Sequence, residues 1–379
     1  MAKRIGIITL YRGYNYGTSL QAYALKQFVA SLGYDTDIIW TAEGAKRGRD
    51  IRIGKIARIF WRCLWHPSLL KHTFLSYKNS LLKDINPKIK AKFLAFAKEY
   101  LAVKALTREK LKSFAYSEDT LAIICGSDQI WSANSANIEP LYFLRFAPQN
   151  KRISYAPSFG AIKVPSYNKK ILAQYIKEIP FISVREAAGA EIVKELTGKQ
   201  AAVLADPTLL LDWEDIKPYQ SKKPYILAYF LDTPSKYALQ TLGDISKKYN
   251  YDIKVFPYRY KEYEQFPGLQ FYPAGPLDFV SLIKGAECVL TDSFHGTVFS
   301  INFNIPFWVF ERNYASAKNQ NTRIISILEK TGLQNHYITK TTPNNLPTGI
   351  DAKAWIIEQR KKAKEYLVQS IEKARGINE

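Results

Sequence analysis

Short apolar runs alternate with amphipathic stretches from the start of the chain. Residues 5–10 form an apolar run that predicts a strand, and a polar loop follows at residues 11–17. Thr18 or Ser19 can cap a helix whose apolar positions recur at helical spacing up to Gly33. Residues 37–40 then form a second apolar run. A strand, a helix and a strand in this order predict a βαβ unit of a parallel sheet.

The same alternation continues along the rest of the chain. Further strands are predicted at residues 121–125, 153–156, 181–184, 202–205, 225–230, 253–256, 288–291 and 307–310. Helices are predicted near residues 235–249, 277–286 and 351–375. A polar stretch with two prolines, residues 212–224, interrupts the pattern once, and there we place a domain boundary.

These elements predict an α/β protein with two successive domains. Residues 1–212 form the N-terminal α/β domain and residues 213–345 the C-terminal α/β domain. Residues 346–379 form a helix that packs back on the first domain. Parallel sheets bind ligands at the carboxyl ends of their strands, so we expect the active site in the interdomain cleft.

Composition narrows the function classes. Of 379 residues, 47% are hydrophobic, which suits a globular chain. Three scattered cysteines predict neither a disulfide framework nor a metal cluster. We expect a cytoplasmic protein, because neither a signal peptide nor a membrane span is recognisable. The 54 Lys and Arg outnumber the 34 Asp and Glu, and a net charge of +20 favours anionic partners.

A histidine follows the predicted strand at residues 288–291. The sequence reads Ser293, Phe, His295, Gly296, Thr297, and a helix is predicted to begin there. Backbone N–H groups at a helix N-terminus bind anions. The histidine can donate to a phosphate or protonate a reacting carbon, and a histidine that only caps the helix is the alternative.

A second polar segment follows the strand at residues 121–125. Ser127 and Gln129 can hydrogen-bond hydroxyl groups, Asp128 can accept a proton, and Trp131 can stack on a sugar ring. An Asx turn packed by a tryptophan explains the same residues without a ligand.

The first loop and two arginines complete the candidates. Arg12, Asn15, Tyr16 and Gly17 precede the first helix, and this loop matches neither the dinucleotide fingerprint nor the P-loop. A generic polar loop is the alternative there.

Arg185 ends a strand and suits a bidentate grip on carboxylate or phosphate, with an ion pair to Glu186 as the competing interpretation. Arg323 offers a second guanidinium, or is a solvated surface residue.

Residues 46–78 form a basic insertion with interleaved aromatic and aliphatic residues. Ile56, Phe60, Trp61, Leu64 and Trp65 share one helical face. Such a helix can bind an anionic membrane surface, or can pack on its own domain. No nucleic-acid-binding motif accompanies it, so we expect no nucleic-acid partner.

Six segments together resemble the polysaccharide pyruvyl transferase family. They are Asn15–Gly17, Gln21–Leu25, Gly126–Trp131, Ser183–Glu186, Asp206–Thr208 and Ser293–Gly296. The resemblance implies two Rossmann-like domains of GT-B-like architecture, and the transfer of pyruvate from phosphoenolpyruvate to a sugar as a cyclic ketal. It assigns His295 as an acid or phosphate ligand and Arg185 as a donor ligand. Many members have arginine where this chain has Ser293, and Arg323 or a lysine is the expected replacement.

The resemblance completes a site hypothesis. His295 and Asp128 are the catalytic pair, and the donor ligands are Arg185, Ser293, Gly296, Thr297 and Arg323. The acceptor ligands are Arg12, Asn15, Tyr16, Gly17, Ser127, Gln129 and Trp131. Phosphoenolpyruvate is a co-substrate, and no other cofactor and no metal is expected. The acceptor is a sugar of a polysaccharide precursor, such as a lipid-linked oligosaccharide at the inner face of the membrane.

Two other functions fit the sequence. A GT-B-like glycosyltransferase would use a nucleotide sugar in the same cleft and would not bind phosphoenolpyruvate. A non-catalytic basic protein would bind membranes or glycans, and would not depend on His295.

Overall fold

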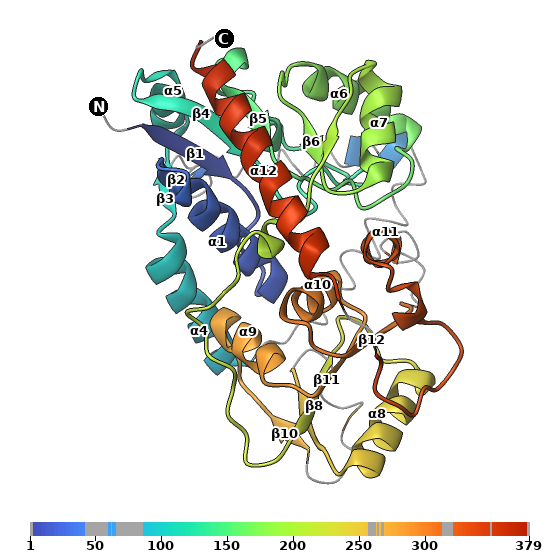
Figure 1. The fold of residues 1–379 in the computed structure, drawn as a ribbon. Helices are drawn as coiled ribbons and strands as arrows, with labels where there is room; N and C mark the ends of the chain where they lie inside the picture. Colours follow the sequence, from blue (N-terminus) through green and yellow to red (C-terminus); the bar gives the residue numbers. More distant parts are fainter. Residues whose placement is uncertain are drawn as a thin grey trace.

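The described part of the chain contains two large parallel β-sheets, each covered by helices, and a small two-stranded sheet (Figure 1). The computed structural model describes residues 3–41, 60–61, 63–65, 86–256, 263, 265–266, 269–312, 321–348 and 351–376. Most of the basic insertion predicted at residues 46–78 therefore lies outside the described residues.

The first sheet has the strand order β3-β2-β1-β4-β5, and all of its pairs are parallel. Its strands are β1 (Arg4–Ile8), β2 (Asp35–Thr41), β3 (Lys104–Leu106), β4 (Thr120–Cys125) and β5 (Arg152–Ser154). A two-stranded parallel sheet, β6 (Ser183–Val184) and β7 (Ala202–Val203), follows. The helices of this half are α1 (Tyr16–Ser31), α4 (Pro87–Phe96), α5 (Arg108–Tyr116), α6 (Ser166–Lys177) and α7 (Ala187–Thr197).

The second sheet has the order β10-β9-β8-β11-β12-β13 and is also parallel. Its strands are β8 (Tyr225–Tyr229), β9 (Asp252–Val255), β10 (Gln270–Phe271), β11 (Cys288–Thr291), β12 (Phe307–Phe310) and β13 (Tyr337–Ile338). The helices are α8 (Lys236–Tyr249), α9 (Pro276–Lys284), α10 (Phe294–Phe303) and α11 (Asn321–Thr331), followed by α12 (Lys353–Ala374). The prediction of an α/β chain with parallel sheets is confirmed.

The first helix begins earlier than its sequence pattern suggested. Asn15, not Thr18 or Ser19, is the N-cap residue, and its side-chain oxygen accepts a hydrogen bond from the Thr18 backbone N–H at 3.1 Å. Asparagine satisfies an orphan donor at this position as well as serine does. Tyr16 and Gly17 therefore belong to the first turn of α1 rather than to a loop.

Tyr16 connects the two halves of the protein. It has no exposed surface, and its hydroxyl donates to the backbone oxygen of Ala274 at 3.0 Å. Its ring stacks on Phe279 with a centroid distance of 4.8 Å and contacts Phe256 at 5.1 Å. Since these partners lie in the second half, the N-terminus of α1 is fixed directly against the second sheet's helices.

The C-terminal helix α12 runs from the second half back to the first sheet (Figure 1). Tyr366 donates from its hydroxyl to the backbone oxygen of Ser154 in β5 at 3.0 Å. Arg360 donates to the backbone oxygens of Leu209 and Leu211 at 2.9 and 2.8 Å. The tail thereby also holds the segment that connects the two halves.

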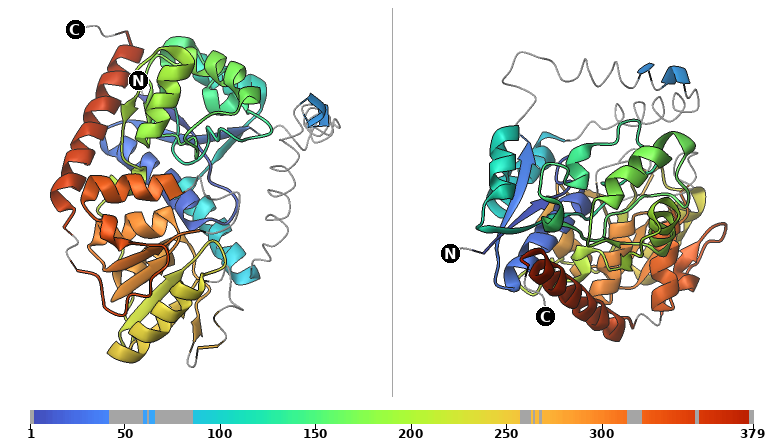
Figure 2. Two further views of the ribbon diagram at one scale, coloured as in Figure 1. Left: turned by 90° about the vertical axis from the view of Figure 1, so that its right-hand side faces the viewer. Right: turned by 90° about the horizontal axis from the view of Figure 1, so that it is seen from above.

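Within the insertion, residues 60–61 and 63–65 are described and are helical. Both views of Figure 2 place them away from the two sheets. Phe60, Trp61, Leu64 and Trp65 are 63, 62, 59 and 74% exposed. Among the described helices, none combines the length and hydropathy needed to span a bilayer.

Candidate active site

The N-termini of α1 and α10 meet between the two sheets. Ser293 caps α10, with its Oγ accepting from the Gly296 backbone N–H at 3.4 Å, and this places His295 in the first turn. The imidazole of His295 lies directly on Gly17, where any Cβ would overlap it. Glycine is therefore required at position 17 for this packing, and two positive helix ends lie on either side of His295.

Asp206 joins His295 to Arg185. Its Oδ2 accepts from Arg185 Nη1 at 2.6 Å and lies 3.7 Å from His295 Nε2. Burial alone would raise the pKa of the Asp206 carboxyl, but the adjacent His295 and Arg185 hold it well below its ordinary value. Its other oxygen, Oδ1, accepts from the backbone N–H and hydroxyl of Thr208. The carboxylate is thus ionised and fixed in orientation.

Arg185 is a buried cation with two carboxylates beside it. Its Nε lies 3.7 Å from Glu186 Oε2, and Glu186 itself accepts from the Ser158 hydroxyl at 2.7 Å. Burial alone would lower the pKa of Arg185, but Asp206 and Glu186 raise it, so the guanidinium stays charged. Both interpretations of Arg185 are thus compatible with its position: it pairs with acids and it faces the cavity described next.

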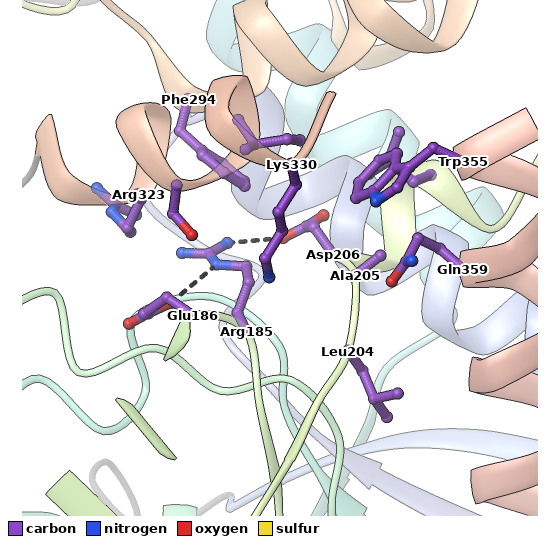
Figure 3. Close-up of a pocket in the computed structure, with 13 residues that line it drawn as sticks. Arg185, Glu186, Leu204, Ala205, Asp206, Phe294, Arg323, Lys330, Trp355 and Gln359 are labelled. Atoms are coloured by element: carbon purple, nitrogen blue, oxygen red, sulfur yellow. Dashed lines mark hydrogen bonds and ion pairs between the residues drawn. The ribbon is translucent and has the colours of Figure 1, made fainter. Parts of the chain in front are cut away.

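A cavity of about 380 Å³, open to solvent, lies beside this cluster (Figure 3). Its polar wall contains Arg185, Glu186 and Asp206 from the first half and Arg323 and Lys330 from α11. The rest of the lining is Leu204, Ala205, Leu209, Phe294, Ser326, Ile327, Trp355 and Gln359.

Phe294 lies between two arginines in this wall. The guanidinium carbons of Arg185 and Arg323 are 4.3 and 5.6 Å from its ring centroid. Burial, and then repulsion from Arg185, lower the pKa of Arg323 to about 9. An anion bound here would relieve that repulsion, so the wall is electrostatically suited to a ligand with negative charge.

Asp128 lies on the α1 side of the site. It is buried, and its Oδ2 accepts from the Thr18 hydroxyl at 2.6 Å while Oδ1 accepts from the Gln129 backbone N–H at 2.8 Å. Ser127 is also buried and donates from Oγ to the Ala156 backbone oxygen at 2.8 Å, with Asp206 Oδ2 at 3.4 Å. Ser127, which follows β4, and Arg185, which follows β6, therefore both contact Asp206.

Two of the predicted acceptor ligands, Trp131 and Tyr16, are buried in structural contacts, whereas Arg12 is exposed. Trp131 has no exposed surface: it stacks on Phe143 and donates from Nε1 to the Tyr142 backbone oxygen. Its indole therefore offers no face to a sugar ring, and the buried Tyr16 offers none either. Arg12 lies at the surface and donates to the Tyr11 hydroxyl at 2.7 Å.

The remaining predicted residues help to build the two helix ends. Asn15 caps α1, and Thr297 is fully buried with its hydroxyl donating to the Ser293 backbone oxygen at 3.0 Å. Gly296 lies against Thr291, where a side chain would not fit. The side chain of Gln129 lies against Gly160, where an added Cβ would overlap its amide nitrogen.

Sequence reasoning missed four residues of the site. Asp206 was recognised only as part of a motif, although its position after a predicted strand was a usable signal. Lys330, Trp355 and Gln359 belong to helices, and no local pattern indicated that they line the cavity.

The fold and the site together define a class of protein: an α/β protein with two large parallel sheets and, beside its buried Arg185–Asp206 pair, a cavity lined by cationic and acidic side chains. The computed structure resembles UDP-GlcNAc 2-epimerase from Methanocaldococcus jannaschii, with 13% identity, a TM-score of 0.51, and coverage of 96% of this chain and 92% of that one. It also resembles the glycosyltransferase SnogD from Streptomyces nogalater, with 10% identity, a TM-score of 0.43, and coverage of 100% and 99%. The first likeness supports the fold alone.

Sequence comparison identifies the family. The model of the polysaccharide pyruvyl transferase family matches residues 15–314, which include every residue of the His295, Arg185 and Asp206 cluster. No curated protein sequence matches the chain significantly. The chain belongs to the polysaccharide pyruvyl transferase family and is a transferase.

Proposed function

We propose that this protein transfers the enolpyruvyl group of phosphoenolpyruvate to a sugar of a polysaccharide precursor, forming a cyclic pyruvate ketal and releasing phosphate. The observation that carries the proposal is the cationic wall of Arg185, Arg323 and Lys330, which adjoins Asp206; the Oδ2 of Asp206 lies 3.7 Å from His295 Nε2. Phosphoenolpyruvate carries about three negative charges near neutral pH and needs such a wall.

The chemistry requires an acid at the donor's methylene carbon. Protonation of that carbon leaves a cationic C2, which one sugar hydroxyl attacks with loss of its proton. Phosphate then leaves with the C2–O bonding electrons, and a second hydroxyl attacks C2 to close the ketal, losing its proton as well. His295 is suited to the first step because an imidazolium is an effective general acid near neutral pH.

The neighbouring groups have distinct parts in this scheme. Asp206 Oδ2 lies 3.7 Å from His295 Nε2 and orients the imidazole, and the α10 N-terminus stabilises the leaving phosphate. Asp128 orients an acceptor hydroxyl through the polar network it shares with Thr18. Ser293, Gly296 and Thr297 contribute through the backbone of the same helix end.

Replacing His295 by glutamine tests the assignment. We expect turnover to fall by about 10²- to 10⁴-fold, the range for a lost general acid, while the melting temperature still rises with phosphoenolpyruvate. The matched control is His336→Gln, because His336 is a buried histidine that contacts the Phe307 backbone oxygen, away from the cavity. Turnover is followed as phosphate release, with mass spectrometry of candidate glycans. Normal turnover in His295→Gln would contradict the proposal.

The glycosyltransferase alternative makes an opposite binding prediction. A nucleotide-sugar enzyme would be stabilised by UDP-sugars and not by phosphoenolpyruvate, whereas the proposed enzyme shows the reverse. Thermal-shift measurements with both ligands on the wild-type chain distinguish the two.

We further propose that the basic insertion binds the anionic inner face of the membrane, where a lipid-linked acceptor would be presented. Residues 46–78 contain nine Lys and Arg and one Asp. Within the described part of this insertion, the four large apolar side chains of Phe60, Trp61, Leu64 and Trp65 are exposed. The double variant Trp61→Ser/Trp65→Ser should sediment less with anionic vesicles. Ile357→Ser, which changes an exposed apolar residue of α12, is the control. Equal sedimentation of all three proteins would exclude the idea.

A further inference from the structure

Lys330 is a cation of the cavity that the sequence did not single out. It lies in the last turn of α11 and lines the cavity together with Arg185, Asp206 and Arg323. Figure 3 shows its side chain extending into the cavity toward Arg185. The helix that carries Arg323 thus supplies a second cation two turns further along.

The charges around Lys330 indicate which kind of ligand it can bind. Lys330 is exposed to solvent at one side of the cavity, and partial burial of its ammonium lowers its pKa, while Glu186 raises it and Lys362 lowers it. Asp206 and Glu186 already neutralise Arg185, by contacts of 2.6 and 3.7 Å. Lys330 therefore adds to the wall a positive charge that is not part of the Arg185 ion pairs, and an anionic ligand is the group that would balance it.

The opposite wall is built by the C-terminal helix. Trp355 and Gln359 of α12 line the cavity across from the cations (Figure 3). Phe294 and Ile327 also line the cavity. Beside the cations, the lining therefore offers a ligand apolar contacts and one side-chain amide for a hydrogen bond. A compact anion with a short carbon skeleton fits this combination.

We propose that Lys330 is a donor ligand: its ammonium binds the phosphate or carboxylate of the donor next to Arg323. This rests on the proposed function, because it assumes phosphoenolpyruvate as the donor. Lysine is a compact charge on a flexible stem and can bind either anionic group.

The test compares Lys330→Met, which keeps the length of the side chain and removes its charge, with Lys330→Arg, which restores a cation. Lys361→Met is the matched control, because Lys361 is 77% exposed on α12 and lies outside the cavity lining. Dissociation constants for phosphoenolpyruvate, inorganic phosphate and pyruvate are measured by calorimetry at one pH and low salt. We expect phosphoenolpyruvate to bind at least tenfold more weakly to Lys330→Met, and within about threefold of wild type to Lys330→Arg and Lys361→Met.

The two smaller probes identify the group that Lys330 holds. A loss confined to phosphate assigns Lys330 to the phosphate end, and a loss confined to pyruvate assigns it to the carboxylate end. Unchanged phosphoenolpyruvate affinity in Lys330→Met would overturn the inference and leave the proposed function intact. If wild type does not bind phosphoenolpyruvate at all, the proposed function fails, and weaker phosphate binding by Lys330→Met would still establish the anion site. Lys330→Gln replaces the methionine variant if that protein does not fold.

Discussion

The ion pair of Asp206 and Arg185 makes a stability prediction that can be worked out from the structure. Asp206→Asn is nearly isosteric and keeps an oxygen that can accept from Thr208, but it turns an N–H donor or a neutral oxygen toward Arg185. The two side chains are 0 and 3% exposed, so water cannot replace the lost charge. Removing one partner of a buried pair costs about 3–5 kcal/mol.

That cost is large enough to measure precisely. At roughly 2.1 cal/mol/K per residue, unfolding of 379 residues has an entropy of about 0.8 kcal/mol/K. For a single unfolding transition, Asp206→Asn should therefore lower the melting temperature by about 4–6 °C. Urea denaturation at neutral pH, followed by circular dichroism, gives the free energy directly.

The control and the double variant separate charge from packing. Glu195→Gln removes a carboxylate of the exposed pair with Lys169, and we expect little change. In Asp206→Asn/Arg185→Met neither full charge of the pair remains, so we expect a smaller loss than the two single losses added together. A loss below about 1 kcal/mol in Asp206→Asn, or strict additivity in the double variant, would refute the reasoning.

The pH dependence follows from the direction of the Asp206 shift. The pKa of its carboxyl is lower in the folded protein than in the unfolded chain. Its contribution to stability is therefore complete above the unfolded value of about 3.9 and is lost as the pH falls below it. Wild type and Asp206→Asn should differ in stability at neutral pH and converge in strong acid.

Three further predictions concern the helix ends and Arg323. Gly17→Ala should displace the His295 imidazole, costing about 1–3 kcal/mol by overpacking and reducing turnover more than donor affinity, as seen by denaturation and steady-state kinetics. Ser293→Ala should remove the α10 cap and cost about 1 kcal/mol in urea denaturation, with donor affinity unchanged because Oγ serves the helix. Arg323→Met should bind the donor at least about tenfold more weakly than wild type in calorimetry, because it removes a guanidinium from the cavity wall.

Much of the fold could be predicted because the signals were local. The apolar runs at residues 288–291 and 307–310 coincide with β11 and β12, since buried parallel strands read as continuous hydrophobic segments. The short strands β3 and β10 carried no such run and were missed. The start of α1 was misplaced because three neighbouring residues are all able to cap a helix, and only the packing of Tyr16 distinguishes them.

Part of the site was also predictable from the sequence, because several of its residues directly follow predicted strands. His295, Arg185 and Asp128 each follow a strand of a different parallel sheet, so topology places each of them at a carboxyl edge, and the packing of the two halves brings these edges together. Trp131 could not be distinguished from a sugar platform, because a sequence shows that an aromatic residue is near the edge but not which side chains cover it. Lys330 and Trp355 reach the cavity from α11 and α12, and only the packing of those helices places them there.

The arrangement of charge suggests a division of labour among the three cations. Arg185 has two carboxylates within 3.7 Å, so its charge is largely balanced inside the protein, and its fixed position organises Asp206 and therefore His295. Arg323 and Lys330 add two further cations to the cavity wall. Neutralising Arg185 should then disturb turnover and stability together, whereas neutralising Lys330 should weaken donor binding with little effect on stability. Parallel denaturation and calorimetry of Arg185→Met and Lys330→Met test this division, and equal losses in both measurements for both variants would contradict it.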